Sequence, residues 1–236
     1  STLLASSAAS DVYKRQKLNN KYQKMKKGIQ IVLALVILGL VYVIAMEIHT
    51  PQAFNKELKQ RNAAVIERLE DIRTAERAFK KKYQYFTGSF DTLINFVLTD
   101  TLEMERKFVD EDDSVAMAQL KKAGKKNIEK FNIAVIDTIF SPRKLSREDI
   151  ENLRYIPFTD NKTQFLLEAA RIVTESKVEI PVVECRAPYK MYLDTIKYRQ
   201  EVINLIDNQV HNLNQYAGLK FGSLEGGNNE AGNWGE

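Results

Sequence analysis

The sequence predicts an α+β fold, with an N-terminal apolar helix that continues into a long amphipathic helix, a small, mostly antiparallel sheet and a long C-terminal amphipathic helix. Three observations support this prediction. Residues 28–46 carry no charge, apolar residues recur every three or four positions over 54–79, and two β-rich runs lie close together at 164–174 and 177–184. Helical periodicity on both sides of short strand-like segments is typical of α+β domains.

The charge of the chain is concentrated at its N-terminus. The 236 residues are 44% hydrophobic and 28% charged, an ordinary globular composition, and the net charge is +4. Residues before position 28 carry +6, which leaves −2 for the rest of the chain. A nucleic-acid-binding domain carries its basic residues on a folded face. No nucleic acid partner is therefore predicted.

The basic N-terminal segment is interpreted in two parts. Ser10-Asp-Val-Tyr-Lys-Arg-Gln16 is typical of a translated cloning remnant, so residues 1–16 are left out of the fold prediction. Residues 17–28 form a basic tail with five lysines: Lys17, Lys21, Lys24, Lys26 and Lys27.

The uncharged stretch predicts a transmembrane anchor over residues 29–48. From Gly28 to Met46 only Gln30 is clearly polar. These 19 residues would span about 28 Å as a helix, which is close to the thickness of the hydrocarbon core. A buried helix of a soluble domain usually has a polar stripe, and this one has none. The residues expected to face lipid are Ile29, Ile31, Val32, Leu33, Leu35, Val36, Ile37, Leu38, Leu40, Val41, Val43 and Ile44.

The lysines before the anchor predict its orientation. Cytoplasmic flanks of membrane helices are enriched in Lys and Arg. The N-terminus is therefore expected in the cytoplasm of a bacterium, and a domain over 50–221 is expected on the periplasmic side of the inner membrane. Val43-Ile-Ala45 has the small-residue spacing of a signal peptidase site. A cleaved signal peptide stays open as the alternative.

An amphipathic helix is expected to begin at Thr50-Pro51, because Thr can cap free amides and Pro is tolerated in the first turn. Its apolar stripe either binds a partner helix or packs on the core of its own domain. The second interpretation is favoured, because a coiled coil needs a longer heptad run. The candidate partner face consists of Phe54, Leu58, Val65, Leu69, Ile72 and Phe79.

The middle of the chain predicts short elements. Ser89 can cap a helix over Phe90–Leu98, and Ser146 can open another through Leu153, with Asp149 completing a capping box. The other predicted elements are a strand over Leu102–Val109, a helix over Ser114–Ala123 ending at Gly124, and a central strand over Phe131–Phe140.

The C-terminal third predicts a hairpin, a helix and a tail. Gln164–Thr174 and Lys177–Glu184 are expected to pair as a β-hairpin. A long helix is expected from Pro188 to Tyr216, and residues 222–236, rich in Gly, Asn and Glu, are expected to be a flexible tail. The stripe of the helix is Tyr192, Ile196, Ile203, Ile206, Val210 and Leu213.

Residues that carry chemistry are scarce. Cys185 is the only cysteine, which excludes an internal disulfide, and His49 and His211 are the only histidines. The acidic run Asp110–Asp113 is interpreted as a loop before a helix, where acids favour the helix dipole. The motifs of nucleotide-binding and hydrolytic sites are missing from the sequence. No catalytic, cofactor or metal site is therefore predicted.

One segment resembles a known family. Ile72-Arg-Thr-Ala-Glu-Arg-Ala-Phe-Lys-Lys-Lys-Tyr-Gln-Tyr-Phe-Thr-Gly-Ser resembles the stretch of bacterial pseudopilins where a long N-terminal helix gives way to a tyrosine-containing turn. The resemblance covers residues 28–98 and implies a role in a secretion or pilus-like assembly. It departs from the pseudopilin processing signature, because Leu33 occupies the position of the conserved Glu. The whole chain is more similar to single-pass bacterial envelope proteins of no assigned activity.

These features predict a non-enzymatic structural or interaction component of the envelope. Its expected partners are the lipid bilayer and envelope proteins, and self-association stays open. The alternative is a ligand-binding or sensory module with a pocket near Tyr189 and Tyr192. An enzyme that uses carboxylates such as Glu168 or Glu184 is a third hypothesis.

Overall fold

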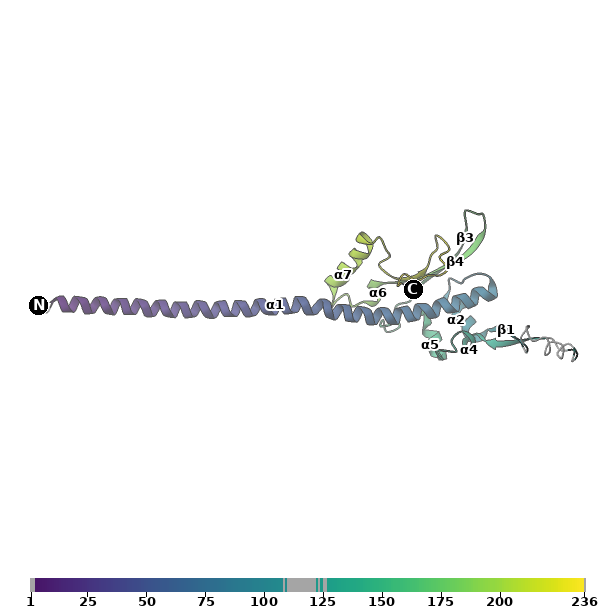
Figure 1. Ribbon diagram of the computed structural model, residues 1–236, viewed down its shortest axis with the longest axis horizontal. Helices are drawn as coiled ribbons and strands as arrows, with labels where there is room; N and C mark the ends of the chain where they lie inside the picture. The colour runs from purple at the N-terminus through teal and green to yellow at the C-terminus, as the bar shows by residue number, and fades with distance from the viewer. Residues whose placement is uncertain (1–2, 108, 110–121, 123, 125–126, 236) are drawn as a thin grey trace. The chain divides into compact units, whose positions relative to one another are not determined.

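The computed structural model describes residues 3–107, 109, 122, 124 and 127–235, with side chains from residue 25 onward. About half of the chain is helix and about a fifth is strand, which confirms the predicted α+β class. The chain forms two compact units, Ser1–Asn55 and Lys56–Glu236. The helix α1 (Leu3–Tyr83) belongs to both, and the other elements belong to the second unit (Figure 1).

The predicted helix start at Thr50-Pro51 is wrong, because α1 continues through Pro51. Proline removes one backbone donor from a helix but does not always end it. The hydroxyl of Thr50 donates a hydrogen bond to the carbonyl of Met46, at 2.9 Å, instead of capping free amides. Helix-favouring sequence on both sides of the proline therefore carries the helix past it.

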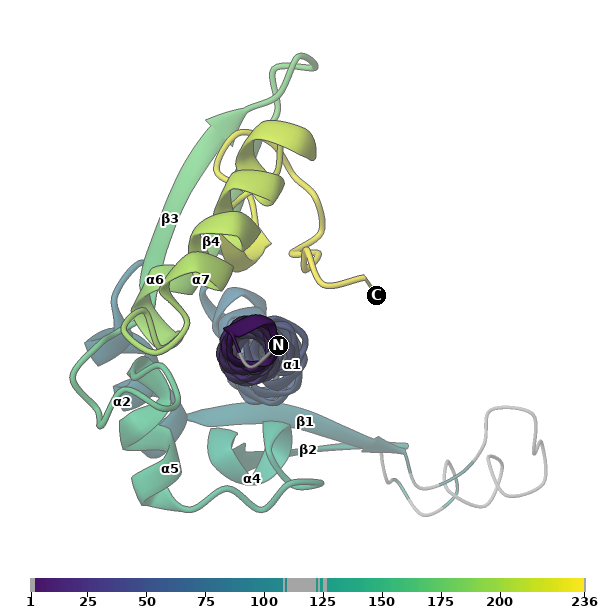
Figure 2. The ribbon, with the colours of Figure 1, turned by 90° about the vertical axis from the view of Figure 1, so that its left-hand side faces the viewer.

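The second unit is built around residues 56–83 of α1. Strands β1 (Thr101–Lys107) and β2 (Ile128–Ala134) lie on one side of this helix, and β3 (Leu166–Val173) and β4 (Glu179–Pro188) lie on the other (Figure 2). The helix therefore buries apolar side chains in more than one direction. Its fully buried residues include Val65, Leu69, Ile72 and Ala75.

The segment after α1 folds as a helix and a two-stranded sheet. Helix α2 (Phe90–Thr99) matches the predicted helix, although Ser89 makes no side-chain cap. Strand β1 matches the predicted strand and pairs antiparallel with β2. The acidic run 110–113 and the helix predicted over 114–123, apart from residue 122, lie outside the described residues.

The predicted central strand over Phe131–Phe140 is wrong. Only its first part belongs to β2, and its second part forms the short helix α4 (Val135–Ile139). A short apolar run does not distinguish a strand from a buried helical turn. The change occurs where Val135 becomes fully buried and its N–H donates to the carbonyl of Asp100, at 3.0 Å.

The capping box predicted at Ser146 is confirmed. The Ser146 side chain accepts from the Asp149 N–H, and the Asp149 carboxylate accepts from the Ser146 N–H. This pair opens α5 (Arg147–Glu151), which continues as the 3₁₀ turn Asn152–Arg154.

Replacing Ser146 by Ala is expected to lower the free energy of unfolding by about 1 kcal/mol, because the Asp149 N–H at the start of the helix loses its acceptor. The measurement is urea unfolding of the detergent-solubilised full chain, followed by the fluorescence of Trp234, the only tryptophan. Ser89→Ala is the matched control, since Ser89 stands at an N-cap without a side-chain cap bond. An equal loss in both variants would contradict the capping argument.

The predicted hairpin is confirmed, and it belongs to a three-stranded antiparallel sheet. β3 pairs with β4, and β4 pairs with β5 (Gly218–Gly222), which the sequence prediction missed. β5 pairs with only the second half of β4, from Glu184 to Pro188. In the part of the chain that the structure describes, the first half of β4 therefore has no strand neighbour on its β5 side.

The predicted long C-terminal helix is shorter and broken. It consists of α6 (Tyr189–Tyr192), α7 (Arg199–Asp207) and a π-helical turn at Asn208–Asn212. The break occurs because the carboxylate of Asp194 accepts hydrogen bonds from the N–H groups of Ile196 and Lys197, at 3.0 and 2.9 Å. This local competition favours a turn over helix continuation.

The segment expected to be a flexible tail makes defined contacts. Phe221 and Gly232 form a β-bridge, and the Gly222 N–H donates to the carbonyl of Ala231 at 3.0 Å. The Asn233 N–H donates to the carbonyl of Lys220, also at 3.0 Å. Residues 231–233 thus cover the outer edge of β5. Backbone pairing of this kind needs few apolar side chains, so the composition of the segment did not indicate it.

Candidate functional site

The predicted anchor is an exposed apolar helix within the first unit. All twelve predicted lipid-facing side chains are between 51% and 65% exposed. Among the described residues, one helix is long and apolar enough to cross a membrane, and its most apolar part has no buried residue. Such a helix near the N-terminus fits a single-pass membrane protein. Lys26 and Lys27 are exposed beside it, whereas Lys17, Lys21 and Lys24 lie in the part of α1 without described side chains.

The predicted partner face of α1 lies mostly in the interior. Val65, Leu69, Ile72 and Phe79 are at most 2% exposed, Phe54 is buried and Leu58 is half-buried. Four of the six residues thus belong to the core of the second unit. The stripe packs on its own domain, as the favoured alternative expected, and does not offer a free surface to another helix.

Glu76 is a carboxylate inside this core. It is fully buried, and one oxygen accepts the Thr87 N–H at 3.0 Å. The other oxygen, Oε1, has no hydrogen-bond partner among the described residues. Burial raises the pKa of Glu76 to about 8, although the bond from Thr87 lowers it. Burial also raises the pKa of the Cys185 thiol, and Glu76 raises it further. Both groups therefore favour their neutral forms, and Cys185 is a free, buried thiol.

A second acidic group on α1 is paired. Asp71 is 5% exposed, and Arg143 contacts both Asp71 and Glu67. Burial raises the pKa of Asp71 to about 6, while Arg143 lowers it. The pairing ties the loop after α4 to α1.

The C-terminal segment is held on α1 by a clasp, defined here as the contacts of Asn229 and Glu230 with Arg73, Arg77 and Lys80. The Glu230 carboxylate lies 3.1 Å from Arg77 Nε and 3.5 Å from Lys80 Nζ. Arg77 also donates to the Asn229 carbonyl at 3.0 Å, and Arg73 donates to the Glu230 carbonyl at 3.5 Å. Three basic side chains of one helix thus recognise one carboxylate and two peptide carbonyls.

Trp234 adds an aromatic contact to this segment. The Arg73 guanidinium lies over its ring, 5.8 Å from the centroid. Cation–π contacts of this kind contribute about 0.5–1 kcal/mol at exposed sites. Because the chain has one tryptophan, its fluorescence reports on this contact.

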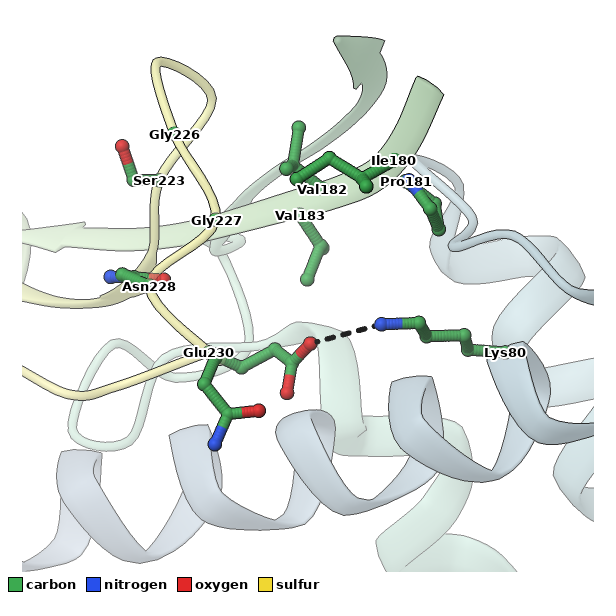
Figure 3. Close-up of a pocket in the computed structure, with 11 residues that line it drawn as sticks. Lys80, Ile180, Pro181, Val182, Val183, Ser223, Gly226, Gly227, Asn228 and Glu230 are labelled. Carbon is green, nitrogen blue, oxygen red and sulfur yellow. Dashed lines mark hydrogen bonds and ion pairs between the residues drawn. The ribbon is translucent and has the colours of Figure 1, made fainter. Parts of the chain in front are cut away.

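A cavity of about 410 Å³ lies beside the clasp (Figure 3). Its apolar wall is the half of β4 that β5 does not cover, from Ile180 to Val183, and its polar wall includes Lys80, Ser223 and Asn228. Gly222, with a φ of +76°, ends β5 and directs the chain away from β4. A Cβ at this position would lie 1.9 Å from the Val183 carbonyl oxygen, so only glycine fits.

The tyrosines of the predicted pocket, Tyr189 and Tyr192, lie in the core. Both tyrosines are buried, and the Tyr192 hydroxyl donates to Asn62 Oδ1 at 2.8 Å. Burial raises the pKa of Tyr192. These side chains fill the core, and the cavity lies at the other end of β4.

The carboxylates of the enzyme hypothesis are paired with basic residues on the sheet. Glu184 accepts from Lys220 Nζ at 2.8 Å, and Glu168 contacts Arg186. His49 and His211 are exposed. Within the part of the chain that the structure describes, no three His, Cys, Asp or Glu side chains are grouped to hold a metal.

Sequence reasoning missed Glu76 and the clasp. Glu76 was detectable, because it stands four residues after Ile72 and three before Phe79, on the apolar stripe. A carboxylate at a stripe position predicts a buried acid. The clasp had no such signal, because its residues lie about 150 positions apart in the chain.

Comparison with known proteins gives no family. No protein-family model, no curated protein and no solved structure matches this chain.

Proposed function

We propose that this protein is a membrane-anchored structural or interaction component of the bacterial cell envelope, without a catalytic role. The observation that carries the proposal is the exposed apolar helix, whose twelve large side chains need a lipid environment. The lysines before it support a cytoplasmic N-terminus and a periplasmic domain. A place in a secretion or pilus-like assembly is the role that the pseudopilin resemblance favours.

A second apolar surface supports a role in protein contacts. Ile196 is 93% exposed in the turn before α7, and three further apolar side chains follow it along the chain. Ile203 on α7, Val210 in the π-helical turn and Leu213 directly after that turn are at least 41% exposed. Grouped exposed apolar residues are typical of interaction surfaces. The sequence prediction assigned the same residues to the apolar stripe of one long helix.

Photocrosslinking from this surface tests the proposal. With benzoylphenylalanine in place of Ile203, irradiation of intact cells is expected to give a defined adduct with an envelope protein, because the position faces a partner. Asn204, exposed on the neighbouring polar face, is the matched control and should give little adduct. Mass spectrometry of the adducts identifies the partner. Equal yields at both positions, or none at either, would count against an interaction surface on α7.

A ligand-binding module is the second candidate, and the cavity beside Lys80 favours it. Its volume lies within the range of small-molecule sites, about 300–1,000 Å³. An apolar wall opposite a few polar groups is also the usual composition of such sites.

A further inference from the structure

We propose that the face of α1 formed by Arg73, Arg77 and Lys80, with the adjoining cavity, binds an acidic peptide segment of a partner protein. In the structure the chain's own C-terminal segment occupies this site and acts as a built-in competitor. The inference rests on the proposed interaction role and names the chemistry of one partner.

The bonding pattern is that of peptide recognition. Arg77 contacts both the Glu230 carboxylate and the preceding peptide carbonyl, of Asn229. Arg73 contacts the next carbonyl, and Lys80 contacts the second carboxylate oxygen. A free anion would use only the charges, whereas these donors also read the backbone on both sides of the acidic residue. Charge-assisted bonds from Arg are the stronger and more directional part of such a site.

The basic residues are accessible although the resident carboxylate is not. Their positions, separated by four and three residues, place them on one face of α1. The side chains of Arg77 and Lys80 are 48% and 40% exposed, whereas that of Glu230 is 11% exposed. An external carboxylate can therefore approach the cations from solvent before the resident one leaves.

The resident segment binds with backbone strain. Asn229 and Glu230 both have φ of 54°, in the left-handed region. Asn adopts this conformation readily, so the strain lies at Glu230. Strain at clamps persists only when surrounding contacts hold it in place. An external peptide can present the same groups without this strain. The resident segment is covalently attached to the domain, so its effective concentration at the site is high compared with that of an external peptide.

The cavity indicates which kind of residue stands next to the acidic residue in the ligand. It adjoins the Glu230 carboxylate and is walled on one side by Ile180, Pro181 and Val182 (Figure 3). An apolar side chain next to the acid in the ligand would cover these residues. The ligand class is thus an extended segment with an acidic residue beside an apolar one.

Fluorescence anisotropy with a peptide in trans tests the site. The probe is a fluorescein-labelled peptide with the sequence of residues 227–235, titrated with the detergent-solubilised full chain at low salt. Glu230→Gln is expected to bind the probe at least about tenfold more tightly than the unmodified chain, because the tethered competitor is weakened. Glu225→Gln removes an exposed acid of the same segment and should bind like the unmodified chain. Arg77→Gln added to Glu230→Gln should lose the gain.

The probe's own carboxylate provides the second control. A peptide with Gln in place of its Glu should bind Glu230→Gln at least about tenfold more weakly than the probe, since the charge-assisted bonds are lost. Equal binding of the two peptides, or no gain in Glu230→Gln, would overturn the proposal. Displacement of the probe by millimolar inorganic phosphate would assign a simple anion site instead. Tight probe binding without any crosslink from Ile203 would retain this site and remove the interaction role proposed for α7.

Discussion

Replacing both Leu35 and Leu38 by Arg is expected to release the full chain from the membrane fraction. On an insertion scale, Leu, Ile, Phe and Val contribute about 0.3–0.6 kcal/mol each, so the twelve apolar residues favour insertion by roughly 4–7 kcal/mol. Each central Arg costs about 2.5–3.5 kcal/mol. Two arginines therefore offset the whole gain, whereas one leaves about 2 kcal/mol in favour of insertion. The measurement is the share of the chain that resists alkaline carbonate extraction.

The matched control is the double replacement of Leu35 and Leu38 by Ile, which keeps the anchor apolar and should leave extraction unchanged. Leu35→Arg alone should leave most of the chain in the membrane, since about 2 kcal/mol still favours insertion. If the double-Arg chain stays in the membrane to the same extent as the control, lipid burial of this helix is not what retains the protein. The proposed envelope location would then lose its main support.

Sequence reasoning succeeded where one interaction within a short segment decides the structure. The uncharged stretch before Glu47 needs no distant partner to be helical and exposed. The hairpin of β3 and β4 follows from two β-rich runs and a short turn. The capping box at Ser146 and Asp149 is also local, because both halves lie within one helical turn.

The predictions from the sequence failed where two local structural preferences competed. The run from Phe131 to Phe140 could form a strand or a buried helical turn. In the fold its first part is strand β2 and its second part is helix α4. In the C-terminal helix the periodicity predicted continuation, and the side chain of Asp194 favoured a turn. At Pro51 the missing donor favoured a helix start, whereas the sequence on both sides favoured continuation.

The site was the least predictable part, because it depends on contacts between distant segments. Arg77 and Glu230 are ordinary surface residues in the sequence, and nothing local pairs them. β5 is short and glycine-bounded, so it lacks a strand pattern until β4 provides its partner. Glu76 alone carried a readable signal, and its chemistry has the clearest consequence for stability.

The stability of the second unit is expected to fall as pH rises, because Glu76 is buried without a cation to pair with it. Its pKa is about 8 in the folded chain and 4.5 when solvated. An acid with a raised folded pKa stabilises the fold while it is protonated. That contribution is complete at a pH below the pKa of the solvated acid, and it is lost as pH rises to the pKa of the folded chain. Between these limits the loss is about 1.4 kcal/mol per pH unit.

Replacing Glu76 by Gln is expected to flatten this dependence, because the amide keeps an acceptor for the Thr87 N–H and carries no titrating proton. Between about pH 6.5 and pH 9 the unmodified chain should lose about 2 kcal/mol of unfolding free energy, and Glu76→Gln should lose much less. Urea unfolding of the detergent-solubilised chain, followed by Trp234 fluorescence, measures both profiles.

Two features separate Glu76 from the other acids. Asp71, with its pKa of about 6, also lowers the unfolding free energy as pH rises. Most of this loss occurs below pH 6.5, and Glu76→Gln keeps it. Glu225→Gln removes an exposed acid and should keep the full slope of the unmodified chain. Parallel profiles for Glu76→Gln and the unmodified chain would mean that Glu76 is already ionised in the fold. Water or a cation would then have to reach its unpartnered oxygen, and the packing of α1 on the sheet would be looser than its buried side chains indicate.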